Sequence, residues 1–149
     1  MTEVQRKLLI IGCSKRKLEF PEAPAIDVYD GPYYRMLRKA KLKAVDISIL
    51  SAKYGLIDHK TKISPYEKKM TPNIAEEMRN SVTTQLKALL RKNSYNEVVI
   101  NLGKIYMKAL DFQSLSEYNP TYKILSGDMV KRIQALKTWI NENSGDAQR

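Results

Sequence analysis

The chain has 149 residues, with 26 Lys or Arg, 16 Asp or Glu, and a single Cys and His, so its formal net charge is +10. This length suffices for one domain with a buried core, and we expect a single domain over residues 1–149 with a frayed polar tail from 143 to 149. The lone Cys13 excludes an intramolecular disulfide and a cysteine-rich zinc site, and the lone His59 cannot build a histidine metal cage. The excess positive charge favours a polyanionic partner.

Strands and helices are predicted to alternate along the chain. Apolar, β-branched segments predict strands over residues 7–12, 46–50, 97–102 and 122–125. Apolar residues at helical spacing predict helices over 33–44, 71–93, 103–110 and 129–142, with Asn73 and Glu76 as a capping box for the second. This order favours an α/β fold in three layers, with a mostly parallel sheet of about four strands and helices on both faces.

The amino-terminal segment has no feature of a membrane anchor. Its apolar run, residues 8–11, is too short for a signal peptide or a membrane span. We therefore expect a cytoplasmic protein with no membrane partner.

The loop after the first predicted strand combines small and basic residues. Gly12 is followed by four candidate ligand-binding residues, Cys13, Ser14, Lys15 and Lys17. Such a loop can offer backbone N–H and ammonium groups to a phosphate, although it lacks the second glycine of a Walker loop. The alternative is a solvated basic turn. Cys13 itself is expected to be buried and not nucleophilic, because a lone cysteine after a strand is usually a small core residue.

The loop after the second predicted strand is crowded with polar and aromatic groups. Its candidate ligand-binding residues are Ser51, Lys53, Tyr54, Gly55 and, further along, Tyr66. Lys53 can neutralise a phosphate, Tyr54 can stack on a base, and Gly55 permits a positive φ. The alternative is that the tyrosines anchor the loop in the core. His59, in the same region, is expected to be exposed and without a role.

Asn101 ends the third predicted strand, and Tyr106 follows one helical turn later. Both are candidate ligand contacts, and structural packing is the alternative for each. Ligands of open α/β sheets bind at the carboxyl ends of the strands, so we expect the three loops to meet there in one basic cleft. The candidate catalytic groups at this edge are Asp30, Lys53 and Asp128, two carboxylates and an amine in or beside loops.

Three blocks of the sequence resemble known families. Residues 54–70 keep the Tyr-Gly-hydrophobic, Ile-x-Pro-Tyr and Met pattern of the YaaA-like peroxide-stress proteins, in Tyr54, Gly55, Leu56, Ile63, Pro65, Tyr66 and Met70. Residues 98–110 are similar to that family's strand ending in Asn-Leu, followed by a Tyr and a short helix. Residues 8–17 are more similar to small domains that pair a Cys-Ser-x-x-Lys loop with a Ser-Ala-Lys-Tyr-Gly-Leu loop, and to the archaeosine-synthase relatives of tRNA-guanine transglycosylase.

The YaaA-like resemblance implies a DNA-glycosylase-like architecture and an association with DNA. Our first hypothesis is thus a cytosolic domain that binds nucleic acid or a nucleotide in the cleft between strand-exit loops, without a cofactor or metal. The second is an enzyme that acts on an N-glycosidic bond or a modified base, as the archaeosine-synthase resemblance implies. The third is a non-catalytic module whose basic helix docks on a partner.

Overall fold

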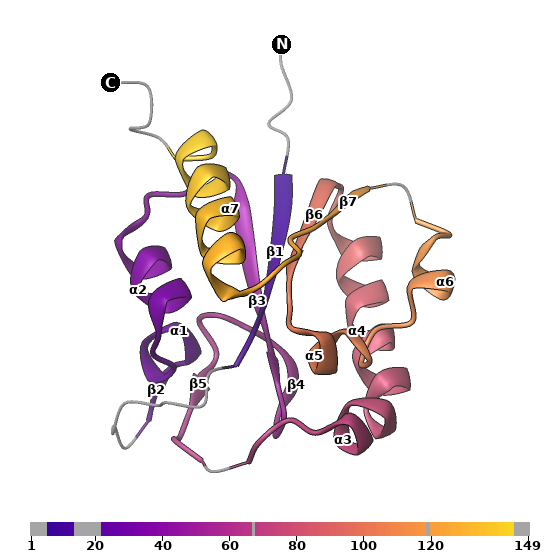
Figure 1. Ribbon diagram of the computed structural model, residues 1–149. Coiled ribbons are helices and arrows are strands. Elements are labelled where there is room, and N and C mark those ends of the chain that lie inside the picture. Colours follow the sequence, from indigo (N-terminus) through magenta and orange to yellow (C-terminus); the bar gives the residue numbers. More distant parts are fainter. Residues whose placement is uncertain (1–5, 14–21, 67, 119, 145–149) are drawn as a thin grey trace.

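The computed structural model describes residues 6–13, 22–66, 68–118 and 120–144, and its centre is a five-stranded sheet in the order β4-β3-β1-β6-β7 (Figure 1). The strands span Arg6–Gly12 (β1), Val45–Ser51 (β3), Gly55–Asp58 (β4), Tyr95–Asn101 (β6) and Thr121–Ile124 (β7). All are parallel to their neighbours except β4, which pairs with β3 in an antiparallel hairpin. The predicted mostly parallel α/β sheet is confirmed. The strand β4 was not predicted, because its residues were expected to belong to the loop after the second strand.

Helices cover both faces of this sheet and make a three-layer fold. One face carries Ala25–Val28 (α1), Pro32–Lys39 (α2) and Met129–Glu142 (α7). The other carries Pro72–Glu77 (α3), Arg79–Lys92 (α4), Lys104–Met107 (α5) and Phe112–Leu115 (α6). Two short strands, Ala23–Pro24 (β2) and Lys62–Ile63 (β5), pair separately.

The central strand β1 divides the hydrophobic core in two. Leu9 and Ile11 pack on the α7 side, whereas Leu8 and Ile10 pack on the α4 side, and all four are fully buried. A strand buried on both faces needs an uninterrupted apolar run, which explains why this segment lacks the polar alternation of a half-exposed strand. The carboxyl end of β1 is thereby held at the middle of the sheet, where the candidate site lies.

Two predicted helices have different bounds. The first was expected to reach Ala44, but α2 ends at Lys39, because the backbone of Lys43 donates to Asn143 and Ala44 adopts a positive φ of 54°. The second is two helices, α3 and α4, which meet at Met78.

The predicted Asn73–Glu76 capping box of that second helix is wrong. Thr71 is the cap, and its hydroxyl accepts a hydrogen bond from Ile74 N at 3.2 Å. Pro72 takes the first helical position, which proline favours, and so the residue before it becomes the cap.

The carboxyl-terminal end of the described chain is tied to the amino edge of the sheet. Lys7 Nζ donates to Asn143 Oδ1 at 2.9 Å, and Ser144 forms a bridge with Leu42, so these two residues of the predicted tail are ordered by contacts. Residues 145–149 lie outside the described part. Within the described ranges, no helix combines the length and the apolar character that a membrane crossing requires.

Candidate functional site

A cavity of about 330 Å³ opens between the carboxyl ends of β1 and β6. The next described helices after β1 pack on one face of the sheet and those after β6 on the other, so the chain diverges here. Such a crevice is where open α/β sheets bind ligands. The lining comes from the end of β1 (Gly12, Cys13), the end of β6 with the residue before α5 (Asn101, Gly103), α5 (Tyr106), and the starts of α2 (residues 30–34) and α7 (Met129, Arg132).

Three of these segments meet at Asn101. Arg132, in the first turn of α7, donates from Nη1 to Asn101 Oδ1 at 3.1 Å. Its guanidinium also lies over the ring of Tyr33, at 5.6 Å from the ring centroid. Residues from β6, α7 and α2 therefore form one wall of the cavity, which we call the Asn101 triad: Tyr33, Asn101 and Arg132.

Two polar atoms of the Asn101 triad have unmet hydrogen bonds. Asn101 is only 2% exposed, yet among the described residues its Nδ2 has no partner, and neither does the buried hydroxyl of Tyr33. Burial raises the pKa of Tyr33, against the opposing effects of the Arg132 charge and of the Asn101 amide, which lies close enough to the phenol to lower its pKa without meeting the geometry of a hydrogen bond, so the phenol stays neutral near pH 7. Buried polar groups in proteins are nearly always hydrogen-bonded, so an unpaired donor on a residue that lines a cavity points to a ligand.

Asp30 lines the same cavity and is ionised at neutral pH. Arg35 approaches it at 3.4 Å and Arg38 at 3.0 Å. Hydrogen bonds from Arg35, from the backbone of Gly31 and from Arg38 lower the pKa of Asp30 to about 2. A carboxylate with so low a pKa is a weak general base, but it supplies a fixed negative charge.

The floor of the cavity is a layer of neutral phenols packed on the end of β1. Tyr34 donates to Gly12 O, and Tyr106 donates to Cys13 O at 3.1 Å while its oxygen lies 3.2 Å from Cys13 Sγ. Burial raises the pKa of both Tyr34 and Tyr106. A side chain at Gly12 would place its Cβ 3.1 Å from the ring of Tyr106, so only glycine leaves this floor undisturbed. Cys13 is buried, as predicted.

The loop after β3 reaches the same sheet edge but forms a separate structure. Cys13 N donates to Leu50 O at 2.9 Å, which confirms that the ends of β1 and β3 are side by side. Ser51 Oγ lies 2.7 Å from Tyr66 Oη, which lies 2.6 Å from Tyr29 Oη. We call Tyr29, Ser51 and Tyr66 the hydroxyl cluster.

The hydroxyl cluster holds the β3–β4 turn in place. Ser51 Oγ accepts hydrogen bonds from Lys53 N and Tyr54 N, and Gly55 takes the positive φ of 79° that the turn needs. The ammonium of Lys53 lies over the ring of Tyr54, 5.2 Å from its centroid. None of these residues lines the cavity, so the predicted single cleft is divided: Cys13, Asn101 and Tyr106 share the cavity, whereas the second loop does not reach it.

The other candidates have structural surroundings or lie outside the described residues. Asp128 caps α7 by accepting a hydrogen bond from Lys131 N at 2.9 Å. The ring of His59, expected to be exposed, is half-buried with Nδ1 3.2 Å from Ile47 O. Ser14, Lys15 and Lys17 are not among the described residues. In the described part of the chain, no group of three or more His, Cys, Asp or Glu side chains could hold a metal ion.

Sequence reasoning missed Tyr33 and Arg132. The signals were present but ambiguous: Tyr33 follows Pro32 at a helix start, and Arg132 lies one turn after the Asp128 cap. Each was indistinguishable from an ordinary helix residue until the fold brought both to Asn101.

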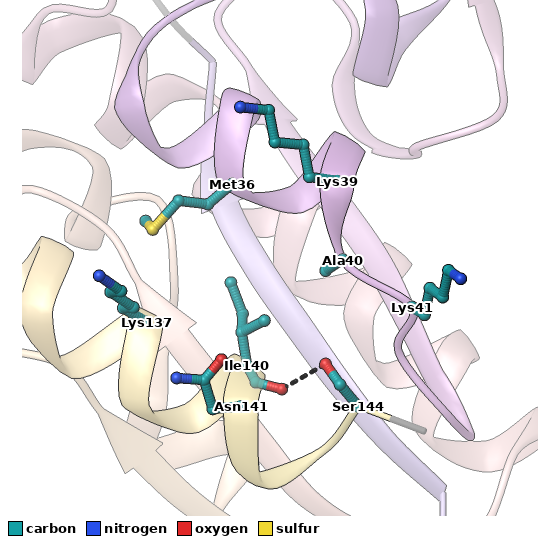
Figure 2. Close-up of a pocket in the computed structure, with 8 residues that line it drawn as sticks. All are labelled: Met36, Lys39, Ala40, Lys41, Lys137, Ile140, Asn141 and Ser144. Carbon is teal, nitrogen blue, oxygen red and sulfur yellow. Dashed lines mark hydrogen bonds between the residues drawn. The ribbon is translucent and has the colours of Figure 1, made fainter. Parts of the chain in front are cut away.

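A second cavity, of about 440 Å³, lies between the carboxyl-terminal ends of α2 and α7, at the opposite edge of the sheet (Figure 2). Its wall includes Met36 and Ile140, and Ser144 Oγ donates to Ile140 O at 2.6 Å. The lysines around it, Lys39, Lys41 and Lys137, are labelled in Figure 2. No buried unpaired polar atom of the described residues lies here, so we assign the functional site to the Asn101 cavity.

Comparison with known proteins adds a family and a fold. The sequence profile of DUF6884, a family of unknown function, matches residues 8–138. The crystal structure of AF0587, also a protein of unknown function, is similar with a TM-score of 0.56 and 18% sequence identity. The match covers 91% of this chain and 44% of AF0587, so this chain spans less than half of that protein. No curated protein matches the sequence.

Proposed function

The chain belongs to DUF6884, a family of unknown function, and we propose that it binds a nucleobase-bearing ligand, either a nucleotide or a nucleotide unit of nucleic acid, with the base in the Asn101 cavity. The observation that carries this proposal is the buried amide of Asn101, whose Nδ2 has no hydrogen-bond partner among the described residues. Asn101 lines the cavity together with Tyr33, whose hydroxyl is also unpaired there. A base edge presents hydrogen-bonding groups of the kind that these two atoms need.

The shape and composition of the cavity support a flat aromatic ligand. Tyr33, Tyr34 and Tyr106 line it, and tyrosine rings offer apolar faces on which a base can pack. Small residues, Gly12 and Gly103, leave room near the strand ends. A cavity of about 330 Å³ is at the lower end of the range for small-molecule sites, which suits a base better than a whole dinucleotide.

Charge at the carboxyl edge supports a phosphate-bearing ligand. Lys53, after β3, and Lys104, at the start of α5, are exposed there. The nearby carboxylates are already engaged, Asp30 by two arginines and Asp128 by the backbone of α7. The net charge of +10, the YaaA-like resemblance with its implied DNA partner, and a free cysteine suited to a reducing cytoplasm are all consistent with this proposal.

Binding should be measured for wild type, Asn101→Leu and a matched control, Asn80→Leu, which changes an exposed asparagine of α4. The ligands are ribonucleosides, their monophosphates, and fluorescent single-stranded DNA and RNA, with affinity followed as a function of salt. We expect wild type and Asn80→Leu to bind alike and Asn101→Leu to bind at least about tenfold more weakly, because a directly bonded base loses its donor. Absence of binding to every ligand, or equal binding by Asn101→Leu, would contradict the proposal.

A second function, cleavage or exchange at an N-glycosidic bond, is favoured by one observation. The ionised carboxylate of Asp30 lines the base cavity and could stabilise positive charge that develops on a ribose. Incubation of the protein with nucleosides and oligonucleotides, followed by chromatography of released base, tests this function. Base release by wild type that is lost in Asp30→Asn would support it, whereas binding without release would leave a binding domain.

A further inference from the structure

The amide of Asn101 has a fixed polarity. The side chain can face the cavity with either its oxygen or its nitrogen, and a buried amide takes the orientation that its neighbours impose. Arg132 is a cation with donors only, and its Nη1 lies 3.1 Å from Asn101 Oδ1. Rotation of the amide by 180° would place two donors against each other, so the oxygen stays on Arg132 and Nδ2 is the atom left without a hydrogen bond.

Arg132 is itself held in the position that fixes this polarity. Its guanidinium lies over the ring of Tyr33, and it belongs to the first turn of α7, which Asp128 caps through Lys131 N. The contacts leave Asn101 as a donor whose oxygen is already used. A ligand group that faces Nδ2 must therefore be an acceptor.

We infer that the cavity selects ligands with an oxo group over those with an amino group at the atom that faces Asn101, an inference that rests on the proposed function. Oxo bases such as hypoxanthine and uracil carry a carbonyl beside a ring N–H, whereas adenine and cytosine carry an amino group beside a ring nitrogen acceptor. The Tyr33 hydroxyl can either donate or accept, so it can serve the ring nitrogen of both kinds. Discrimination thus comes from Asn101, with Arg132 as its positioning residue.

The test compares two neutral pairs of nucleosides, inosine with adenosine and uridine with cytidine, by calorimetry or ligand-observed NMR. Neutral probes remove the contribution of phosphate charge. We expect at least about a tenfold preference for an oxo member over its amino partner in wild type, because an amino group would leave two buried donors facing each other.

Three variants distinguish an effect on the orientation of the Asn101 amide from a general disturbance of the cavity. Arg132→Leu removes the donor that fixes the orientation of the Asn101 amide, so the oxo and amino members of each pair should bind with nearly equal affinity. Arg132→Lys keeps a cation with donors only beside Oδ1 and should keep the preference. Lys137→Leu, a matched loss of charge on the exposed face of the same helix, should behave as wild type.

The outcomes distinguish the inference from the proposal beneath it. Binding of the nucleosides without an oxo preference, or with a preference that Arg132→Leu leaves intact, would overturn the inference alone. Failure of all four nucleosides to bind would remove the proposed base cavity and the inference with it. If Arg132→Leu unfolds, the Arg132→Lys result decides: loss of the preference in a folded Arg132→Lys protein would overturn the role of the donor.

Discussion

The hydroxyl cluster and the Asn101 triad lie at the same edge of the sheet and differ in how their hydrogen bonds are met. In the cluster, Tyr29, Ser51 and Tyr66 bond to one another and to the turn that follows β3. In the triad, Asn101 Nδ2 and Tyr33 Oη lack partners among the described residues. The polar groups of the hydroxyl cluster hold the β3–β4 turn in place, whereas two polar atoms of the Asn101 triad make no hydrogen bond with a described residue. Polar residues at a sheet edge are thus distinguished by their partners and not by their type.

The largest effect should come from Ser51→Ala, which tests whether the hydroxyl cluster is structural. The change leaves Lys53 N, Tyr54 N and the Tyr66 hydroxyl without their shared partner, and unmet buried groups cost about 1 to 3 kcal/mol each before relaxation. We expect the free energy of unfolding to fall by about 2 to 3 kcal/mol in chemical denaturation. The control is Ser81→Ala, at an exposed position of α4.

Nucleoside affinity of the folded Ser51→Ala protein should equal that of wild type. A loss of nucleoside affinity with unchanged stability would indicate that the β3–β4 loop binds the ligand. The hydroxyl cluster would then not be purely structural.

A smaller loss of stability should follow Tyr66→Phe. It removes one hydroxyl that joins Ser51 to Tyr29, while Ser51 keeps both backbone donors, so we expect about 1 to 2 kcal/mol. Tyr54→Phe is the matched control, because among the described residues the Tyr54 hydroxyl makes only a long, exposed contact of 3.5 Å to Ser64 O. This substitution should change the free energy of unfolding by less than about 0.5 kcal/mol. Equal melting temperatures for the two variants would show that the Tyr66 hydroxyl contributes no net stability.

The stability of the protein at low pH should depend on Asp30. Its pKa is lowered to about 2 in the folded protein, below the ordinary value of 3.8, so the folded state binds fewer protons than the unfolded state between these values. The stabilisation is therefore complete above pH 4 and is lost as the pH falls toward 2. We expect the melting temperatures of wild type and Asp30→Asn to converge over this range, with Asp27→Asn as the control. A constant difference from pH 7 to pH 2 would count against a carboxylate held by Arg35 and Arg38.

The smallest effect on stability should come from Asn101→Leu, although it should abolish most binding. Leucine has a similar size and removes the unmet Nδ2 donor, which offsets the loss of the acceptor for Arg132. We expect the free energy of unfolding to change by less than about 1 kcal/mol in either direction. A loss comparable to that of Ser51→Ala would mean that Asn101 is a structural residue like those of the hydroxyl cluster.

The sequence predicted the strands well because their apolar runs are unambiguous. Residues 7–12 and 97–102 were expected within one or two positions of β1 and β6. The antiparallel β4 was missed, because residues 55–58 follow a polar turn whose geometry depends on Ser51 accepting two backbone hydrogen bonds. Ala44 was placed in a helix by spacing alone, whereas long-range contacts with Lys7 and with the end of α7 end the helix earlier.

The candidate site was predictable only in part, for a physical reason. Asn101, Tyr106 and Cys13 were found because each follows a strand, and the fold brings strand ends together. The Ser51–Gly55 loop was predicted as a site by the same rule. Whether the Ser51 hydroxyl already has hydrogen-bond partners depends on Tyr66 and Tyr29, which are distant from it in the sequence. Tyr33 and Arg132 belong to helix starts, and no local pattern shows that two helix starts meet.

The position of β1 has a consequence for synthesis. It precedes every other strand of the sheet along the chain but occupies the centre, where Lys7 pairs with Val45 on one side and with Glu97 on the other. At a translation rate of about 5–20 residues per second, on the order of 3 to 10 seconds separate the emergence of β3 from that of β6. During that interval one edge of a strand with an apolar middle, residues 8–11, has no partner, which is the condition that favours pairing with other chains. The nascent chain is therefore most exposed to pairing with other chains until β6 adds to the sheet beside β1.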